Sequence, residues 1–136
     1  MPVSLEFRGC GVIFWAYGVL AGQEVLEANR AAYGHEFKQA LRFQLAINSR
    51  VEDCLASPDE ERELASMDTE FSSSDPRIVI AVAESDYLYG VLRMWNIQVD
   101  SDTFQSFVVR SIDKAREILR EHGIELGELD YPANCD

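Results

Sequence analysis

Two serines in the stretch at positions 46–60, AINSRVEDCLASPDE, stand where a hydroxyl group can do chemistry. Ser49 follows the apolar, alternating run LRFQLAI, and Ser57 opens a predicted helix. A serine at either place can act as a nucleophile, a phosphate acceptor or a helix cap. Ser57 is followed by Pro58 and, three residues on, by Glu60, which is the pattern of a capping box with proline at the first helical position. Ser49 lacks such a local role, so it is either a modification site or an ordinary residue of a strand-end turn.

The second helix is predicted to be acidic. Nine acids and a single base, Arg62, lie between positions 52 and 75, and Asp59, Glu60 and Glu63 fall near the start of the helix. Acids at a helix N-terminus are favoured by the helix dipole, which makes a solvated face one explanation. The other is a docking face for a partner protein with a basic surface.

Signatures of catalysis and of metal binding are absent from the sequence. It has no phosphate-binding loop, no GxGxxG and no GxSxG, and neither His35 nor His122 has ligand spacing. The three cysteines are far apart and form no CxxC pair. We therefore predict no metal, no cofactor and no enzymatic activity. An unrecognised site that converges on His35 or Cys54 is the remaining alternative.

Composition bounds the class of protein. The chain has 136 residues, of which 47% are hydrophobic, enough for one globular domain, and a net charge of -12. Such a charge repels phosphate backbones and anionic lipid, so nucleic acid is not an expected partner. No apolar stretch reaches the roughly 20 residues of a membrane span, and from the residues MPVSLEFRG we expect no signal peptide. We expect no membrane insertion and a cytoplasmic location.

Hydrophobic periodicity predicts the order ββαβαβαβα. The expected elements are strands at 4–9 and 11–18, a helix at 21–33, a strand at 41–47, a helix at 58–71, a strand at 77–83, a helix after Ser85, a strand at 104–110 and a helix at 112–122. The first two strands must form an antiparallel hairpin, and the later crossovers favour parallel pairing. We expect one domain at 1–123 and a loosely packed tail at 124–136.

The strand at 41–47 indicates how the helices are distributed. Its apolar residues alternate with Arg42, Gln44 and Asn48, whereas a central parallel strand covered on both sides is apolar throughout. The fold class is therefore α/β (α+β-like), a mixed five-stranded sheet with helices mainly on one face.

This pattern resembles the STAS domain, the fold of the bacterial anti-sigma-factor antagonists, and more closely the SpoIIAA-like proteins. The likeness rests on the segments GVLAGQEVLEANRAAY, LRFQLAINS, RIVIAVAESDYLYGVLRMW and FVVRSIDKAREIL, and it extends over nearly all of the chain up to His122. It implies a regulatory module that docks a protein partner, with a homodimer as a further expectation.

In STAS antagonists, a serine or threonine at the start of the second helix is phosphorylated by an anti-sigma kinase, and the added charge blocks docking. The resemblance makes Ser49 and Ser57 the candidates for this switch. The loop here departs from the family's Asp-Ser-Ser-Gly type, because it is longer and acidic.

An alternative function also follows from the resemblance. SpoIIAA-like proteins are similar to lipid-binding SEC14-like folds, which wrap an apolar groove. Trp15, Tyr17, Tyr89 and Trp95 are the candidate lining of such a groove for lipid or another small apolar ligand. Aromatic residues of an ordinary core are the competing explanation.

Overall fold

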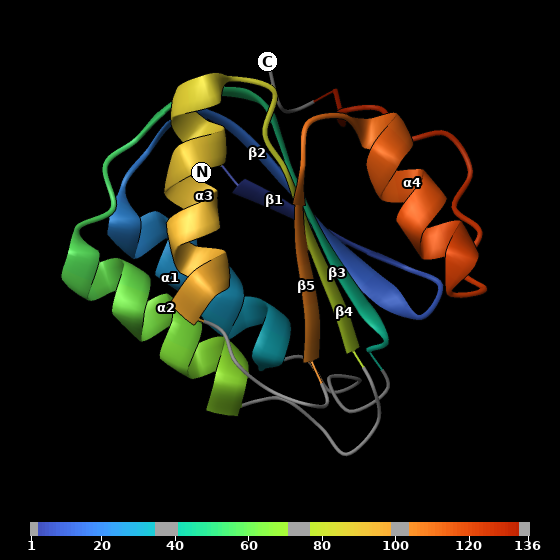
Figure 1. The fold of residues 1–136 in the computed structure, drawn as a ribbon, viewed down its shortest axis with the longest axis horizontal. Helices are drawn as coiled ribbons and strands as arrows, with labels where there is room; N and C mark the ends of the chain where they lie inside the picture. The colour runs from blue at the N-terminus through green and yellow to red at the C-terminus, as the bar shows by residue number, and fades with distance from the viewer. Residues whose placement is uncertain (1–2, 35–40, 71–76, 99–103, 134–136) are drawn as a thin grey trace.

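The computed structural model describes residues 3–34, 41–70, 77–98 and 104–133 (Figure 1). Its elements follow the order expected from the sequence. They are β1 (Val3–Arg8), β2 (Gly11–Leu20), α1 (Gly22–Tyr33), β3 (Phe43–Cys54), α2 (Pro58–Glu70), β4 (Arg77–Val82), α3 (Asp86–Gln98), β5 (Phe104–Val109) and α4 (Ile112–Glu121). No helix in the described ranges is long and apolar enough to cross a membrane.

The five strands form one mixed sheet in the order β1-β2-β3-β4-β5. β1 is antiparallel to β2, and each later neighbour is parallel, as predicted. The hairpin is tight because Arg8 pairs with Gly11 and leaves a two-residue turn, in which Gly9 has a φ of 58°. That left-handed conformation favours glycine and matches the twist of the two strands.

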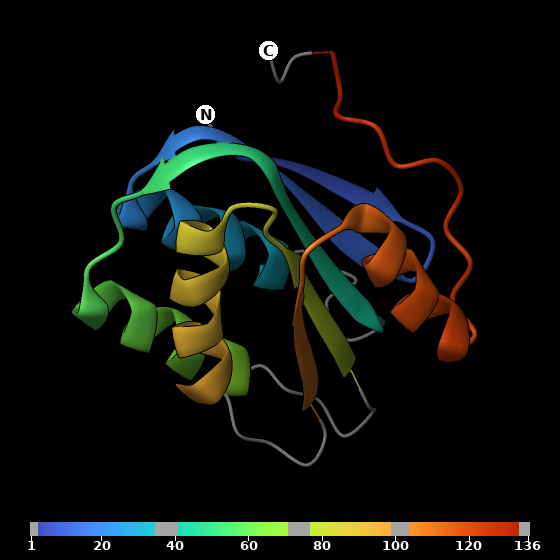
Figure 2. The ribbon, with the colours of Figure 1, turned by 45° about the horizontal axis from the view of Figure 1, so that its top comes forward.

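Three helices, α1, α2 and α3, lie on one face of the sheet, and α4 lies on the other (Figures 1 and 2). The prediction of helices mainly on one face is confirmed. However, the face of the sheet that carries the polar residues of β3 is covered by helices. Gln44 and Asn48 are buried on the three-helix side. Asn48 Nδ2 donates to the carbonyl of Val82 at 3.0 Å, which links β3 to the last residue of β4.

The larger hydrophobic core lies on the α4 face. The large strand residues of this face, such as Trp15, Phe43 and Ile80, are fully buried against α4. The segment after α4 completes this core, because Ile124, Leu126 and Leu129 are each no more than 8% exposed. The expected loosely packed tail is therefore wrong for residues 124–133. Figure 2 shows this segment leaving α4 and running back along the same side of the sheet.

β3 is longer than the sequence predicted, and it is irregular. It continues to Cys54, and its pairing with β2 shifts register between Trp15–Ile47 and Tyr17–Arg50. A β-bulge therefore lies at positions 48–49 of β3. Ser49 is inside the strand rather than in a turn after it.

Tyr131 of the C-terminal segment forms hydrogen bonds with backbone groups on both strands at the bulge. Tyr131 Oη lies 2.6 Å from the carbonyl oxygen of Ala16 and 3.0 Å from that of Ile47, and it accepts a hydrogen bond from the N–H of Arg50 at 3.1 Å. The guanidinium of Arg50 lies 4.3 Å from the centre of the same ring. The hydroxyl thus replaces ladder hydrogen bonds that the register shift removes.

Candidate functional site

The junction of β3 and α2 holds the first candidate residue, Ser57. The N–H of Glu60 donates to Ser57 Oγ at 3.1 Å, and the N–H of Ser57 donates to Glu60 Oε1 at 3.0 Å. The predicted capping box is confirmed. β3 ends at Cys54 and α2 begins at Pro58, so Ser57 is the serine at the start of the second helix, after the third strand. Its side chain is exposed.

The three acids predicted as a docking face all make contacts within the chain. Asp59 pairs with Arg62, and Glu63 pairs with Arg30 of α1 at 3.0 Å. Glu60 Oε2 also accepts a hydrogen bond from the amide of Gln23 at 3.0 Å. The backbone hydrogen bond from Ser57 is the main cause that lowers the pKa of Glu60. Glu60 and Glu63 therefore link α2 to α1, whereas the Asp59 pair lies within α2. The docking role of the three acids stays a prediction.

Ser49 does not present its hydroxyl to solvent. Its Oγ is buried and has no hydrogen-bond partner among the described residues. A kinase needs an accessible hydroxyl, so the position favours Ser57 over Ser49 as a phosphate acceptor. A role for either serine as a switch stays a prediction.

Two exposed apolar side chains flank the same junction. Leu55, directly after β3, and Tyr87, in the first turn of α3, are each 60% exposed. The negative charge of Asp53, with which the Tyr87 hydroxyl forms a hydrogen bond, is the main cause that raises the pKa of this tyrosine. On the other side of the first turn, Arg110 donates to Asp86 at 2.7 Å. The first turn of α3 therefore contacts the end of β3 through Tyr87 and Asp53, and the residue after β5 through Asp86 and Arg110.

The aromatic residues predicted to line one groove lie on different parts of the molecule. Trp15 is fully buried on the α4 face, and its ring centre lies 5.0 Å from that of Tyr131. Tyr17 packs against the same core. Tyr89, on α3, has Arg110 4.9 Å from its ring centre. The side chain of Trp95 lies outside the described part of the structure. The three described side chains do not form a common groove.

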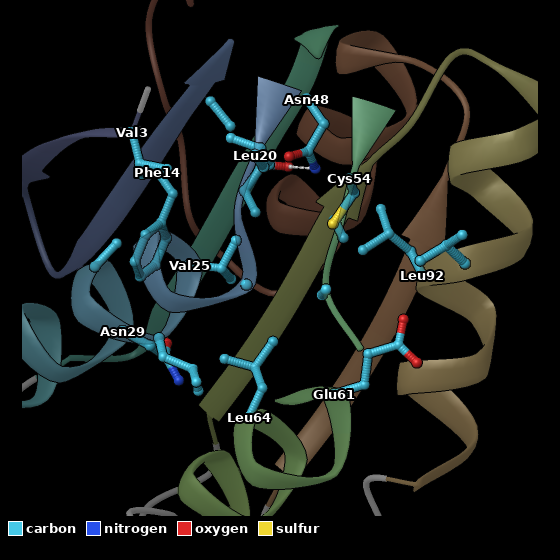
Figure 3. Close-up of a pocket in the computed structure, with 18 of the residues that line it drawn as sticks. Val3, Phe14, Leu20, Val25, Asn29, Asn48, Cys54, Glu61, Leu64 and Leu92 are labelled. Atoms are coloured by element: carbon cyan, nitrogen blue, oxygen red, sulfur yellow. Dashed lines mark hydrogen bonds between the residues drawn. The ribbon is translucent and has the colours of Figure 1, made fainter. Parts of the chain in front are cut away.

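A cavity of about 140 Å³ lies elsewhere, between the sheet and the three helices α1–α3 (Figure 3). The strand residues that line its floor include the small Ala46 and Ala81, together with Val79 on β4 and Phe14 on β2. Its walls come from the helices and include Val25, Leu64 and Leu92.

Three ionisable groups line this cavity: Cys54 at the end of β3, and Glu60 and Glu61 in the first turn of α2. Figure 3 labels Cys54 and Glu61. Burial raises the pKa of both the Cys54 thiol and the Glu61 carboxyl. The acids Glu61, Asp53 and Glu60 raise the pKa of Cys54 further. A thiol whose pKa is raised is a poor nucleophile, and the other residue of the catalytic alternative, His35, lies outside the described residues.

Comparisons with known proteins bear on the fold. No protein-family profile and no curated protein matches the sequence. Among solved structures, the chain is similar to the anti-sigma factor antagonist SpoIIAA in its unphosphorylated form. The TM-score is 0.60 over 90% of this chain and 99% of that one, at 14% sequence identity. The chain has the STAS/SpoIIAA-like fold. At this identity the likeness establishes the fold and leaves the activity open.

The cavity in this SpoIIAA-like fold was not predicted from the sequence. The available signal was the small size of alternate strand residues, Ala16, Ala46 and Ala81, opposite large residues on the other face. Small residues across neighbouring strands leave space under covering helices unless helix side chains fill it. Which helix side chains meet them is a tertiary property, so the pattern alone did not locate the cavity.

Proposed function

We propose that the protein is a regulatory module that docks a protein partner through the β3–α2–α3 junction. The observation that carries the proposal is the exposed apolar pair Leu55 and Tyr87, beside the accessible Ser57. Exposed large apolar side chains are the usual anchors of protein interfaces when they occur together. SpoIIAA, whose fold this chain shares, is named as an antagonist of an anti-sigma factor, which supports a regulatory role.

Charge favours a basic partner surface. Asp53, Glu84 and Asp86 lie beside the apolar pair, and the whole chain carries a net charge of -12. Complementary charge accelerates association and excludes acidic competitors. The proposed partner therefore combines an apolar pocket with basic residues around it.

Ser57 is the proposed switch. It stands two residues from Leu55, so a phosphate on its hydroxyl would lie within the proposed contact and would have to lose water on docking. The phosphate would also repel Glu60, whose carboxylate accepts the hydrogen bond from the Ser57 N–H. Both effects weaken docking when Ser57 is modified.

Site-specific crosslinking tests the docking surface. A photoreactive residue at position 55 should become crosslinked to a partner protein. The same residue at position 7 should not, because Phe7 is exposed at the opposite end of the sheet. Leu55→Arg and Tyr87→Arg should each weaken binding of that purified protein at least tenfold, because an aromatic or aliphatic anchor contributes about 2 kcal/mol or more. Phe7→Arg is the matched control. Equal binding by all three variants would refute the surface.

A pair of capping serines tests the switch. Ser57→Asp and Ser111→Asp place a negative charge at the N-caps of α2 and α4, which lie on opposite faces of the sheet. Aspartate is itself a good N-cap, so both variants should fold. Loss of partner binding in the first variant alone supports the switch. Loss in both, or in neither, counts against it.

A further inference from the structure

We propose that the cavity between the sheet and α1–α3 binds a small organic cation. In this complex an apolar body occupies the cavity, and an ammonium group remains at its edge beside Glu61. The inference does not depend on the proposed docking surface, because neither Leu55 nor Tyr87 lines the cavity.

The size and lining of the cavity set the body of the ligand. A cavity of about 140 Å³ is close to the ~150 Å³ at which an apolar engineered cavity holds a benzene ring. The floor of Ala46 and Ala81 and the walls of Val25 and Leu64 offer such a body dispersion contacts on several sides. A phenyl ring or a branched alkyl group of similar size fits, and a fatty-acid chain does not.

Glu61 sets the charge of the head group. Figure 3 shows its side chain pointing from α2 toward Leu92 of α3, at the side of the cavity where Cys54 lies. Its carboxylate makes no ion pair or hydrogen bond within the described residues, although burial makes its charged form costly. A bound ammonium group would supply the missing partner.

The surrounding potential has the sign that this head group requires. Burial raises the pKa of the Cys54 thiol most, and the nearby carboxylates of Glu61, Asp53 and Glu60 raise it further. Three carboxylates around one thiol give this side of the cavity a negative potential. The basic side chains of Arg30 on α1 and Arg62 on α2 are already engaged, by Glu63 and Asp59 respectively. A carboxylate ligand would meet repulsion here, and a neutral one would leave Glu61 without a counter-charge.

Three probes with one body and different charges separate these possibilities. Benzylamine, benzyl alcohol and benzoate are titrated into the full chain, and binding is followed by NMR of the methyl groups. We expect affinity to fall in that order. Shifts should occur at Val25, Leu64 and Leu92, which line the cavity, and not at Ile118 or Leu119 on the α4 face. Equal affinities, or shifts on the α4 face, would overturn the proposal.

Variants test the two parts of the site separately. Glu61→Gln should weaken benzylamine about tenfold, as expected for a lost charge-assisted hydrogen bond, and leave benzyl alcohol unchanged. Glu52→Gln, an exposed carboxylate of β3 that does not line the cavity, is the matched control for net charge and should change neither. A loss in both variants would indicate a general field effect and refute the head-group assignment.

Filling the cavity tests the body. Ala81→Leu should abolish binding of benzylamine and benzyl alcohol together, because Ala81 lies in the cavity floor. If this variant does not fold, the smaller change Ala46→Val should weaken both ligands. Unchanged binding in a folded cavity-filling variant would overturn the proposed location.

Discussion

The two faces of the sheet are packed in opposite ways. On the α4 face, the strands carry large side chains such as Ile13, Phe43 and Ile80, all fully buried, and one helix with the C-terminal segment covers them. On the other face, β3 and β4 carry the small residues Ala46 and Ala81, three helices cover the sheet, and a cavity remains. More covering helices therefore do not mean tighter packing, because the size of the strand residues decides how much space is filled.

The difference implies a division of roles. The α4 face supplies most of the apolar burial, and we assign it to stability. The three-helix face bears the exposed junction and the cavity, and we assign it to binding. The experiments below test that division, from the largest expected effect to the smallest.

Removing the C-terminal segment should have the largest effect. A chain that ends at Gly123 loses the buried side chains of Ile124, Leu126 and Leu129. Each contributes about 1.5–3 kcal/mol, so the free energy of unfolding should fall by about 5 kcal/mol, which is much of the stability of an ordinary domain. Urea denaturation measures it. A shortened chain as stable as the full one would show that residues 1–123 fold independently of the segment.

Adding two methyl groups should distinguish the faces. Ala115→Val, in the tightly packed core of α4, should cost about 1–3 kcal/mol because of overpacking. Ala81→Val extends into the cavity and should be neutral or stabilise by up to about 1 kcal/mol, as cavity-filling changes commonly do. The same denaturation experiment compares them. Equal losses would mean that the cavity closes in solution.

The cap of α2 gives a smaller effect. Ser57→Ala removes the acceptor of the Glu60 N–H and should cost about 1 kcal/mol. Ser57→Asp keeps an acceptor and should retain most of this stability. A thermal melting temperature unchanged in the alanine variant would contradict the capping role.

The smallest effect is an opposite response of two adjacent carboxyls to pH. Folding lowers the pKa of Glu60, so its stabilising contribution is present above its ordinary pKa and is lost as the pH falls through the lowered one. Folding raises the pKa of Glu61, so its charge is destabilising above the raised pKa, and this penalty disappears as the pH falls.

Melting temperatures of the wild type and of two variants, from pH 7 to pH 3, measure these two contributions to stability. Glu60→Gln should melt below the wild type at neutral pH, and Glu61→Gln should melt above it. Both differences should shrink in acid. Two shifts of the same sign would show that the environments of these carboxyls are alike.

Local patterns in the sequence were enough to predict several features of the fold. The order of the elements, the fold class and the capping box of Ser57 follow from hydrophobic period and from residues within one helical turn. The cavity, the buried hydroxyl of Ser49 and the bulge in β3 could not be predicted in this way. Those depend on contacts between distant segments, such as that of Tyr131 with Ala16, which are separated by 115 residues. No periodicity within a single element specifies which distant side chain will meet it, so these features appear only when the whole chain is packed.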